Sequence, residues 1–251
     1  MDQSRAWGLV ARKYDELFVD PYQEDGHNPV LRAISGMQGK SSLVVGDFGC
    51  GTGPFLPRLA SQFKHVIAVD FSEEMIKEAR RRCKGLKNIS FYQLPFDHLD
   101  ELSQKVDLAV SMNSLVSSDV SILDNALASM RKAVRKQGHL YGIVPSLEGL
   151  FYHIMHLTDL ALDRGMSLPD AQKFAANKAE LHGYDLNTAT FTFDKIHQHL
   201  WLREEVEHRL QKAGYRQIQV RKAGLPWDQF AEGRTLKKFP QSWDWAFKVT
   251  V

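Results

Sequence analysis

Cysteine is almost absent from this chain, which has only Cys50 and Cys83 among its 251 residues. Two isolated cysteines cannot build the disulfide framework of a small secreted domain. Long apolar runs are lacking too, and no stretch approaches the roughly 20 residues of a membrane-spanning helix. No signal peptide is visible in residues 1–8, so we expect a cytoplasmic protein with no membrane partner.

An excess of charge of either sign is also lacking, because 32 basic residues nearly balance 30 acidic ones. A net charge of +2 predicts no broad basic surface, so we expect no nucleic-acid partner. The densest basic cluster, Arg80–Arg82, is typical of a solvated helix end. With 43% hydrophobic residues the chain can form a full core, and we predict one domain over residues 1–251.

The most informative segment is Val44–Gly53, with the sequence VVGDFGCGTG. It starts with a short β-branched run that is typical of a central strand in a parallel sheet, and Asp47 lies where this strand ends. Ligands bind at the carboxyl edge of such sheets. Gly49, Gly51 and Gly53 have no Cβ, so the backbone can turn sharply and a cofactor can lie against it.

A second acid follows at the spacing of an adenosine-cofactor site. Val66–Val69 predicts a neighbouring strand, and Asp70 follows it about 20 residues after the glycine loop, where a carboxylate can accept hydrogen bonds from both ribose hydroxyls. Ser72 is positioned to cap the next helix. A nicotinamide dinucleotide is disfavoured, because its third glycine would fall at Pro54.

These residues resemble the class I S-adenosylmethionine-dependent methyltransferases, whose first motif is an acid followed by G-x-G-x-G. DFGCGTG matches that motif, VDFSEEMI matches the family's second strand and helix start, and VDLAVSMNSL matches its fourth strand. The resemblance implies an α/β fold, a three-layer Rossmann-like sandwich with a seven-stranded, mostly parallel sheet and an antiparallel last strand. It also implies S-adenosyl-L-methionine as cofactor and S-adenosyl-L-homocysteine as product.

The resemblance further assigns roles to single residues. Asp47 and the loop backbone would hold the methionine moiety, and Asp70 the ribose. Asn113 and Ser114 would face the methyl group, while Tyr14 with Asp15 would belong to a lid. The expected cofactor-binding residues are Tyr14, Asp47, Gly49, Cys50, Gly51, Gly53, Asp70, Phe71, Met75, Phe96, Asp97, Asn113 and Ser114.

The sequence departs from the family pattern at the adenine. Phe71 and Met75 would contact the adenine faces, but Pro95 occupies the position at which the family often has an acid for the adenine amino group. Asp97 or a backbone carbonyl would take over that contact, with Phe96 beside it.

An insert is expected after the fifth strand. Residues 147–200 predict a cap, with helices over 150–163 and 170–181 followed by one alternating strand over 188–201. Residues 1–36 predict N-terminal lid helices. Elsewhere we expect strands over 89–93, 106–112, 139–145, 215–222 and 243–251, and helices over 124–135 and 204–213.

The cap contains the candidate catalytic side chains. Tyr152 and His153 share one expected helix with His156, and His199 shares a strand face with His197. We predict Tyr152, His153 and His199 as bases or substrate donors, while their alternative role is packing in the cap. We expect no metal site, because no cysteine or clear carboxylate set accompanies these histidines.

The expected function is transfer of a methyl group to a small-molecule substrate by in-line displacement. Such a reaction needs alignment, exclusion of water and in some cases a base. Three alternatives stay open: an RNA or protein methyltransferase, a non-catalytic S-adenosylmethionine-binding protein of the same fold, and a nicotinamide-dependent dehydrogenase.

Overall fold

The computed structural model describes residues 3–11, 28–193 and 195–251. Its centre is a seven-stranded sheet with the order β3-β2-β1-β4-β5-β10-β9. β10 is antiparallel to both of its neighbours, and the other neighbouring pairs are parallel. The predicted mostly parallel sheet with one antiparallel strand is therefore confirmed. Its strands are β1 (Val44–Phe48), β2 (His65–Asp70), β3 (Ile89–Gln93), β4 (Val106–Met112), β5 (Val134–Val144), β9 (Arg216–Leu225) and β10 (Ser242–Thr250).

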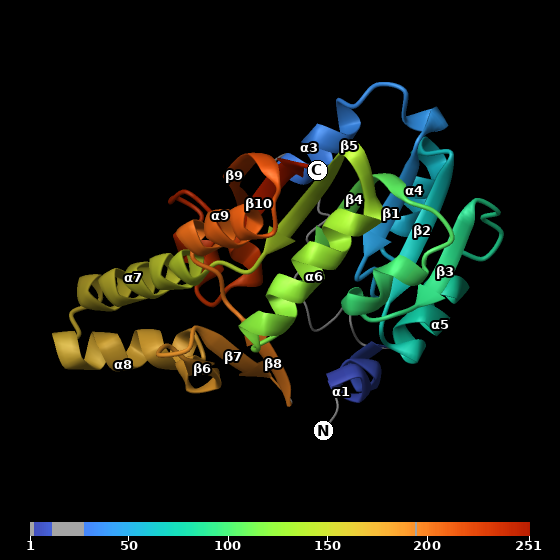
Figure 1. The fold of residues 1–251 in the computed structure, drawn as a ribbon. Helices are drawn as coiled ribbons and strands as arrows, with labels where there is room; N and C mark the ends of the chain where they lie inside the picture. The colour runs from blue at the N-terminus through green and yellow to red at the C-terminus, as the bar shows by residue number, and fades with distance from the viewer. Residues whose placement is uncertain (1–2, 12–27, 194) are drawn as a thin grey trace.

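Helices cover both faces of this sheet (Figure 1). Successive strand side chains point to opposite faces, so Val45 packs into one core while Val44 and Phe48 pack into the other. The helices of the first core are α3 (Pro29–Ser35), α4 (Leu56–Gln62) and α5 (Glu73–Arg82), and those of the second are α6 (Val120–Ala133) and α9 (Arg203–Lys212). The result is the expected three-layer sandwich.

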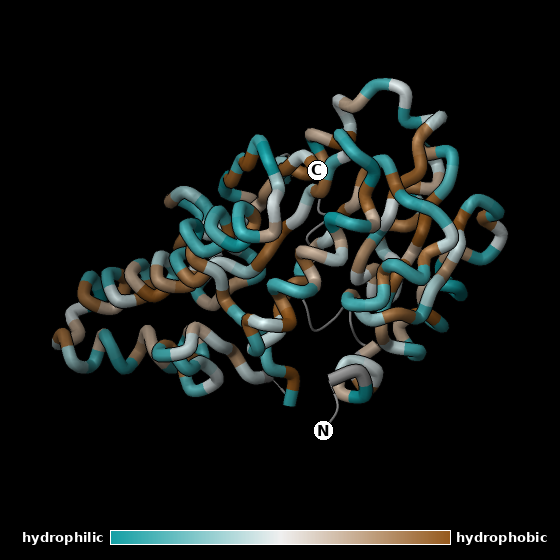
Figure 2. Tube along the Cα trace, viewed as in Figure 1, coloured by the Kyte–Doolittle hydropathy of each residue, from teal (hydrophilic) through white to brown (hydrophobic). Residues whose placement is uncertain are grey.

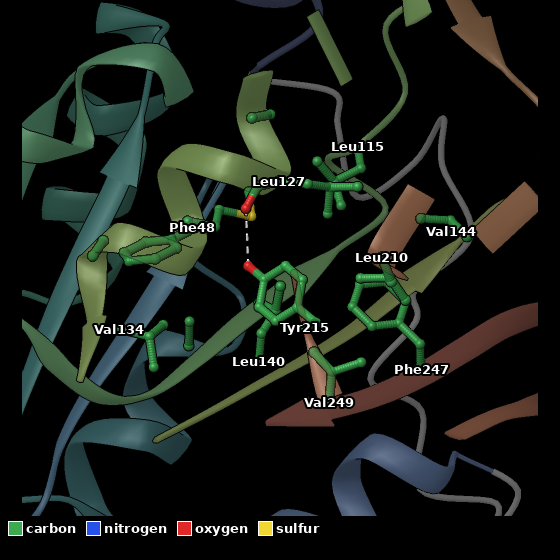
Figure 3. Packing of buried hydrophobic residues seen from close by; sticks show 14 of the residues in the cluster. Phe48, Leu115, Leu127, Val134, Leu140, Val144, Leu210, Tyr215, Phe247 and Val249 are labelled. Atoms are coloured by element: carbon green, nitrogen blue, oxygen red, sulfur yellow. Dashed lines mark hydrogen bonds between the residues drawn. The ribbon is translucent and has the colours of Figure 1, made fainter. Parts of the chain in front are cut away.

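Tyr215, directly before β9, ties the second core together. Its side chain lies in the same buried cluster as Leu140, Leu210 and Val249, and its hydroxyl donates to the Leu127 carbonyl over 3.0 Å (Figure 3). A buried hydroxyl needs such a partner, because leaving it unpaired would cost about 1–3 kcal/mol. The contact therefore fixes α6 against the last two strands.

Hydrophobic stretches follow the central strands, and the outer turns are mostly hydrophilic (Figure 2). Within the described part of the chain, no helix is both long and apolar enough to cross a membrane.

Local signals in the sequence placed several boundaries correctly. β3 and β4 span the predicted ranges 89–93 and 106–112. Ser72 caps α5 by accepting a hydrogen bond from the Met75 N–H over 3.4 Å. Acidic residues occupy the first turn of α5 and Arg80–Arg82 its last turn, which complements the helix dipole at both ends.

The boundary between α6 and β5 differs from the prediction. A helix was expected to run to Arg135 and a strand to begin at His139, but α6 ends at Ala133 and β5 begins at Val134. Val134 pairs with Val106 of β4, and the register shifts before Leu108. The apolar Val134 fits either a helix face or a strand, and pairing with β4 decides for the strand.

The insert between β5 and β9 contains two helices, α7 (Leu147–Asp163) and α8 (Leu168–Lys178), which project from the sheet (Figure 1). The expected single strand over 188–201 is wrong. The chain forms a hairpin in which β7 (Thr190–Phe193) pairs antiparallel with β8 (Ile196–His199), and β6 (Tyr184–Asp185) completes a separate three-stranded sheet. Lys195 adopts a positive φ of 70° in the turn, which the continuous alternation of side chains does not reveal.

The cap also includes the connection between β9 and β10. This connection contains η5 (Trp227–Gln229) and α10 (Gly233–Leu236). Trp227 and Leu236 form a buried cluster with Leu157 of α7 and Ala175 of α8. Two segments that are about 70 residues apart in the sequence therefore build one cap core.

Candidate active site

The glycine loop between β1 and α4 is held by the end of β2. The N–H groups of Gly49 and Cys50 donate to the Val69 carbonyl over 2.8 and 2.9 Å. The Gly51 N–H donates to Oδ2 of Asp70 over 2.9 Å, while Oδ1 of Asp70 accepts from the Ser72 N–H over 2.9 Å. Asp70 thus fixes the loop and the start of α5 together.

Left-handed backbone at two positions explains the glycines of this loop. Gly49 has φ +80°, and a Cβ there would collide with the side chain of Ser114. Gly51 has φ +52°, and a Cβ there would point into open space with no described atom within 4 Å. The first glycine thus permits close packing, and the second leaves a surface against which a ligand can lie.

Three neighbouring hollows meet at the carboxyl edge of the sheet. The first, which we name the glycine-loop cavity, has a volume of about 70 Å³. Helix α1 (Gln3–Val10) covers it through Trp7. Its lining residues are Trp7, Gly49, Gly51, Asp70, Phe71, Met75, Phe96, Met112, Asn113, Ser114 and Val116.

The second hollow, the outer groove, has a volume of about 380 Å³. It shares Trp7, Phe71, Phe96, Ser114 and Val116 with the glycine-loop cavity, so the two are adjoining. Further lining residues include Leu94, Pro95, Asp97 and Ile122. The groove is largely apolar, as the binding site of a planar base requires.

The third hollow, the cap cavity, has a volume of about 480 Å³ and lies between the sheet edge and the cap. It shares Trp7 and Asn113 with the glycine-loop cavity. Its walls come from Asn113 just after β4, α7, the β6–β8 sheet and β10, including Ser146, His153, Tyr184, Phe191, Gln198, Trp243 and Asp244. The glycine-loop cavity thus adjoins the outer groove on one side and the cap cavity on the other.

Asp47 and Asp70 are buried carboxyls at this edge. Burial, with the neighbouring Asp70 charge as the second cause, raises the pKa of Asp47 to about 7. Burial also raises the pKa of Asp70 to about 6, against the opposing effect of the N–H groups of Ser72, Gly51 and Phe71. Two adjacent buried acids favour a ligand that brings positive charge, because such a ligand stabilises the ionised carboxylates.

The residues fit a nucleoside with a cationic tail. Neither carboxylate oxygen of Asp47 has a hydrogen-bond partner among the residues that the structure describes. Oδ2 of Asp70 accepts from Gly51 and Oδ1 from Ser72, and the Phe71 N–H also donates to this carboxylate. A carboxylate has about four lone-pair sites in all, so one remains for a hydroxyl. The open space at Gly51 lies beside Asp70, so an ammonium or sulfonium group would find compensating charge there.

Most of the predicted cofactor-binding residues come together. Gly49, Gly51, Asp70, Phe71, Met75, Phe96, Asn113 and Ser114 all line the glycine-loop cavity, and Asp97 lines the outer groove. Asp47, Cys50 and Gly53 do not line these hollows: Asp47 is fully buried, Cys50 is 2% exposed, and Gly53 packs against Ala79 of α5. Tyr14 and Asp15 lie outside the described residues, so their lid role stays a prediction.

The predicted lid is described only in part. Trp7 and Ala6 of α1 pack near Met75 and Ile196, which places this helix over the site. α3 instead packs its buried residues against the sheet. The asparagine cap at Asn28, which accepts hydrogen bonds from Val30 and Leu31, fixes where α3 begins.

The three predicted catalytic side chains are dispersed. Tyr152 lies in the cap core, where its hydroxyl donates to the Pro240 carbonyl over 3.3 Å. His153 lines the cap cavity, but its Nε2 lies 3.2 Å from the Ala231 carbonyl, and burial lowers its pKa. His199 is 4% exposed, is absent from the described lining of the three hollows, and pairs through Nε2 with Glu205 over 2.9 Å.

Sequence reasoning missed two residues of the site. Asp244 of β10 is 8% exposed and lines the cap cavity beside Asn113. The alternating pattern of WDW predicted a strand there, but only strand pairing brings this acid to the carboxyl edge of β4 and β5. Trp7 lines all three hollows. Nothing in the sequence around this tryptophan predicts that it belongs to the site.

Known proteins agree with this geometry. Residues 45–138, which hold the glycine loop, Asp70 and Asn113, match the sequence profile of the methyltransferase domain family. This segment of the chain is thus similar to the methyltransferase domain family. The segment that matches the methyltransferase domain runs from β1 into β5 and contains most of the described lining of the glycine-loop cavity.

Curated methyltransferases match this domain over a limited length. The chain is 28% identical over 109 residues to malonyl-[acyl-carrier protein] O-methyltransferase of Bacillus anthracis, covering 43% of this chain and 39% of that protein. It is 34% identical over 93 residues to methyltransferase nsrG of Aspergillus novofumigatus, covering 37% and 35%. The matched segments thus span less than two fifths of these relatives.

Among solved structures, the fold extends over the whole chain. N-methyltransferase NodS from Bradyrhizobium japonicum, in complex with S-adenosyl-L-homocysteine, superposes with a TM-score of 0.62. The comparison covers 100% of this chain and 98% of NodS, at 16% identity. Identity at this level shows a shared fold, in which the cap and the terminal strands are included.

Proposed function

We propose that this chain binds S-adenosyl-L-methionine and transfers its methyl group to a small molecule held in the cap cavity. The observation that carries the proposal is the meeting of the glycine-loop cavity and the cap cavity at Asn113. A donor on one side and an acceptor on the other would face each other there. When bound, the cofactor supplies a methyl group activated by a sulfonium, so the protein has to align the reactants and exclude water.

Different residues of the described site would bind different parts of the cofactor. Asp70 would accept hydrogen bonds from the ribose, and the backbone at Gly49 and Gly51 would lie against the methionine moiety. Phe71, Phe96 and Asp97 would surround the adenine in the outer groove, and Asp97 lines it beside Pro95. The unpaired carboxylate of Asp47 would compensate the cationic end of the cofactor from beneath the loop.

The whole chain would act as one domain, with residues 147–200 as an acceptor-side cap. A cavity of about 480 Å³ between the sheet edge and the cap supports a small acceptor. An RNA or protein acceptor would instead require an open cleft at Asn113. The names of the curated relatives, which include a malonyl-[acyl-carrier protein] O-methyltransferase, support the chemistry but leave the acceptor open.

Calorimetric titration with S-adenosyl-L-homocysteine and with NAD tests the cofactor. We expect saturable binding of the homocysteine nucleoside and none of NAD. Incubation with labelled S-adenosyl-L-methionine and fractionated metabolite pools, followed by mass spectrometry, then tests transfer. Binding of NAD alone would contradict the proposal, and label found only in RNA or protein would favour those acceptors.

A further inference from the structure

Asp244 is a buried carboxylate that the cofactor site does not use. It lies in β10, where Trp243 and Trp245 flank it, and it reaches the carboxyl edge of the sheet because β10 runs antiparallel to β5. Its Oδ1 accepts from the Ser146 N–H over 3.2 Å and its Oδ2 from Nδ2 of Asn113 over 3.4 Å. Two long hydrogen bonds leave most of its accepting capacity unused.

This carboxylate lines the cap cavity and forms no salt bridge with the described residues of that cavity. Among the described residues of that cavity, the basic side chains are Lys178 and His153. Lys178 is exposed and lies 3.5 Å from Glu232, and His153 is engaged with the Ala231 carbonyl. Asp244 therefore has no described cationic partner within its own cavity.

The remaining walls suit a cation. Tyr184, Phe191 and Phe230 line the cavity, and the faces of aromatic rings attract positive charge. Trp243 also lines it, and its ring already has the Lys222 ammonium 3.2 Å from its centroid. Glu180 adds a second acid among its exposed lining residues. Burial raises the pKa of Asp244 to about 6, and the charges of Glu180 and Asp244 contribute, after burial, to raising that of Tyr184 to about 12. An anionic ligand would be repelled from this end of the cavity.

We infer that the cap cavity takes an amine acceptor, whose ammonium group Asp244 binds beside Asn113. This inference rests on the proposed function and names its substrate class. The carboxylate accepts one proton from the ammonium, which leaves a neutral nitrogen with a free lone pair. That lone pair would form the new N–C bond as the S–C bond of the donor breaks, and S-adenosyl-L-homocysteine would be the leaving group. Asp244 then releases its proton to solvent, so the carboxylate is restored after each turnover.

Three probes with one aromatic body and different end groups test the charge preference: 2-phenylethylamine, 2-phenylethanol and phenylacetate. Each is titrated calorimetrically at pH 7.5 into wild-type protein, with and without S-adenosyl-L-homocysteine. We expect the amine to bind at least about tenfold more tightly than phenylacetate, as a charge-assisted contact provides. Equal affinities, or no measurable binding of the amine, would overturn the inference.

Two matched variants locate the effect. Asp244→Asn should weaken binding of the amine by about tenfold or more and change that of the alcohol by less than about threefold. Asp185→Asn removes the same charge from an exposed position outside the described lining of the cap cavity and should change either affinity by less than about threefold. Equal losses in both variants would show general electrostatics and overturn the role of Asp244.

The same titrations separate two kinds of failure. Absence of S-adenosyl-L-homocysteine binding by the wild type would reject the proposed function, whatever the probes do. Normal binding of that nucleoside without a preference for the amine would reject the acceptor class alone. Thermal unfolding checks that Asp244→Asn is folded, and if it is not, the wild-type comparison of the three probes decides.

Discussion

Asn113 donates a hydrogen bond to Asp244 over 3.4 Å at the place where the glycine-loop cavity and the cap cavity meet. Asn113 has a positive φ of 50°, which is rare for a residue with a side chain and is tolerated best by asparagine and aspartate. Its N–H donates to the Ile143 carbonyl of β5 over 2.9 Å. The strained backbone thus directs the amide toward β10 and links the two hollows.

Replacement of Asp70 should weaken cofactor binding. Asp70→Ala removes a buried carboxylate that would accept ribose hydroxyls, and we expect S-adenosyl-L-homocysteine affinity to fall at least about tenfold by calorimetry. Asp107→Asn is the control, because Asp107 also accepts a backbone hydrogen bond, from Val44, but lies at the start of β4, far from the site. Unchanged affinity in Asp70→Ala would reject the ribose role.

A side chain at Gly51 should block the cofactor. Gly51→Val places a branched side chain into the open space of the loop, and we expect loss of measurable S-adenosyl-L-homocysteine binding. Gly85→Val is a matched control, since Gly85 also has a positive φ, of 95°, and no described atom within 4 Å of an added Cβ. Both variants carry a similar backbone strain. Normal binding by Gly51→Val would mean that the loop is only a turn.

The stability of the cofactor-free protein should fall as the pH rises through the range of Asp47. The folded-state pKa of about 7 lies above the ordinary value of 3.8, so the folded chain binds more protons than the unfolded chain between these values. The stabilisation is complete below pH 3.8 and is lost as the pH rises through 7. In Asp47→Asn, the free energy of unfolding should therefore decline less steeply with pH. The slope should differ by up to about 1.4 kcal/mol per pH unit, which corresponds to one proton.

Urea unfolding at several pH values measures that slope. Asp119→Asn is the control: hydrogen bonds from Ser121 lower the pKa of Asp119, so its contribution is lost as the pH falls. An identical pH dependence in Asp47→Asn and wild type would show that Asp47 is ionised throughout.

Removal of the Trp7 side chain should open the site without unfolding the protein. Trp7 is the described residue that lines all three hollows, and Trp7→Ala removes this aromatic surface. We therefore expect S-adenosyl-L-homocysteine to bind about tenfold more weakly. Leu9→Ala lies on the same helix with a 71% exposed side chain and should bind normally. Equal affinities in the two variants would exclude α1 from the cofactor site.

His199→Ala distinguishes packing from catalysis. His199 pairs with Glu205, stacks edge-on against Trp201 and is 4% exposed, so its loss should lower the free energy of unfolding by about 2–3 kcal/mol. S-adenosyl-L-homocysteine affinity should stay unchanged, and His208→Ala, at an exposed position of α9 outside the described lining of the three hollows, serves as control. Slower methyl transfer by a variant of unchanged stability would instead support the sequence-based prediction of a catalytic base.

The cofactor side of the site was predictable because its residues are close in sequence. Gly49, Gly51 and Asp70 belong to two consecutive strands and the loop between them, so spacing alone brings them to one edge. The acceptor side was not predictable in the same way. His199 was predicted because imidazole can act as a base, but in the structure it pairs with Glu205 of α9. Asp244, which does reach the site, lies in a strand about 130 residues after Asn113.

The parallel sheet, the glycine loop with its left-handed turns and the acid that fixes this loop follow from local properties of the chain: strand periodicity, glycine spacing and helix caps. The fold of the cap, the burial of the histidines and the choice of the acid that faces the acceptor depend on long-range packing. Those outcomes depend on the antiparallel entry of β10 and on the packing of Trp227 with α7 and α8. Contacts between distant segments produce no repeating pattern in the sequence, because each segment taken alone is compatible with several environments.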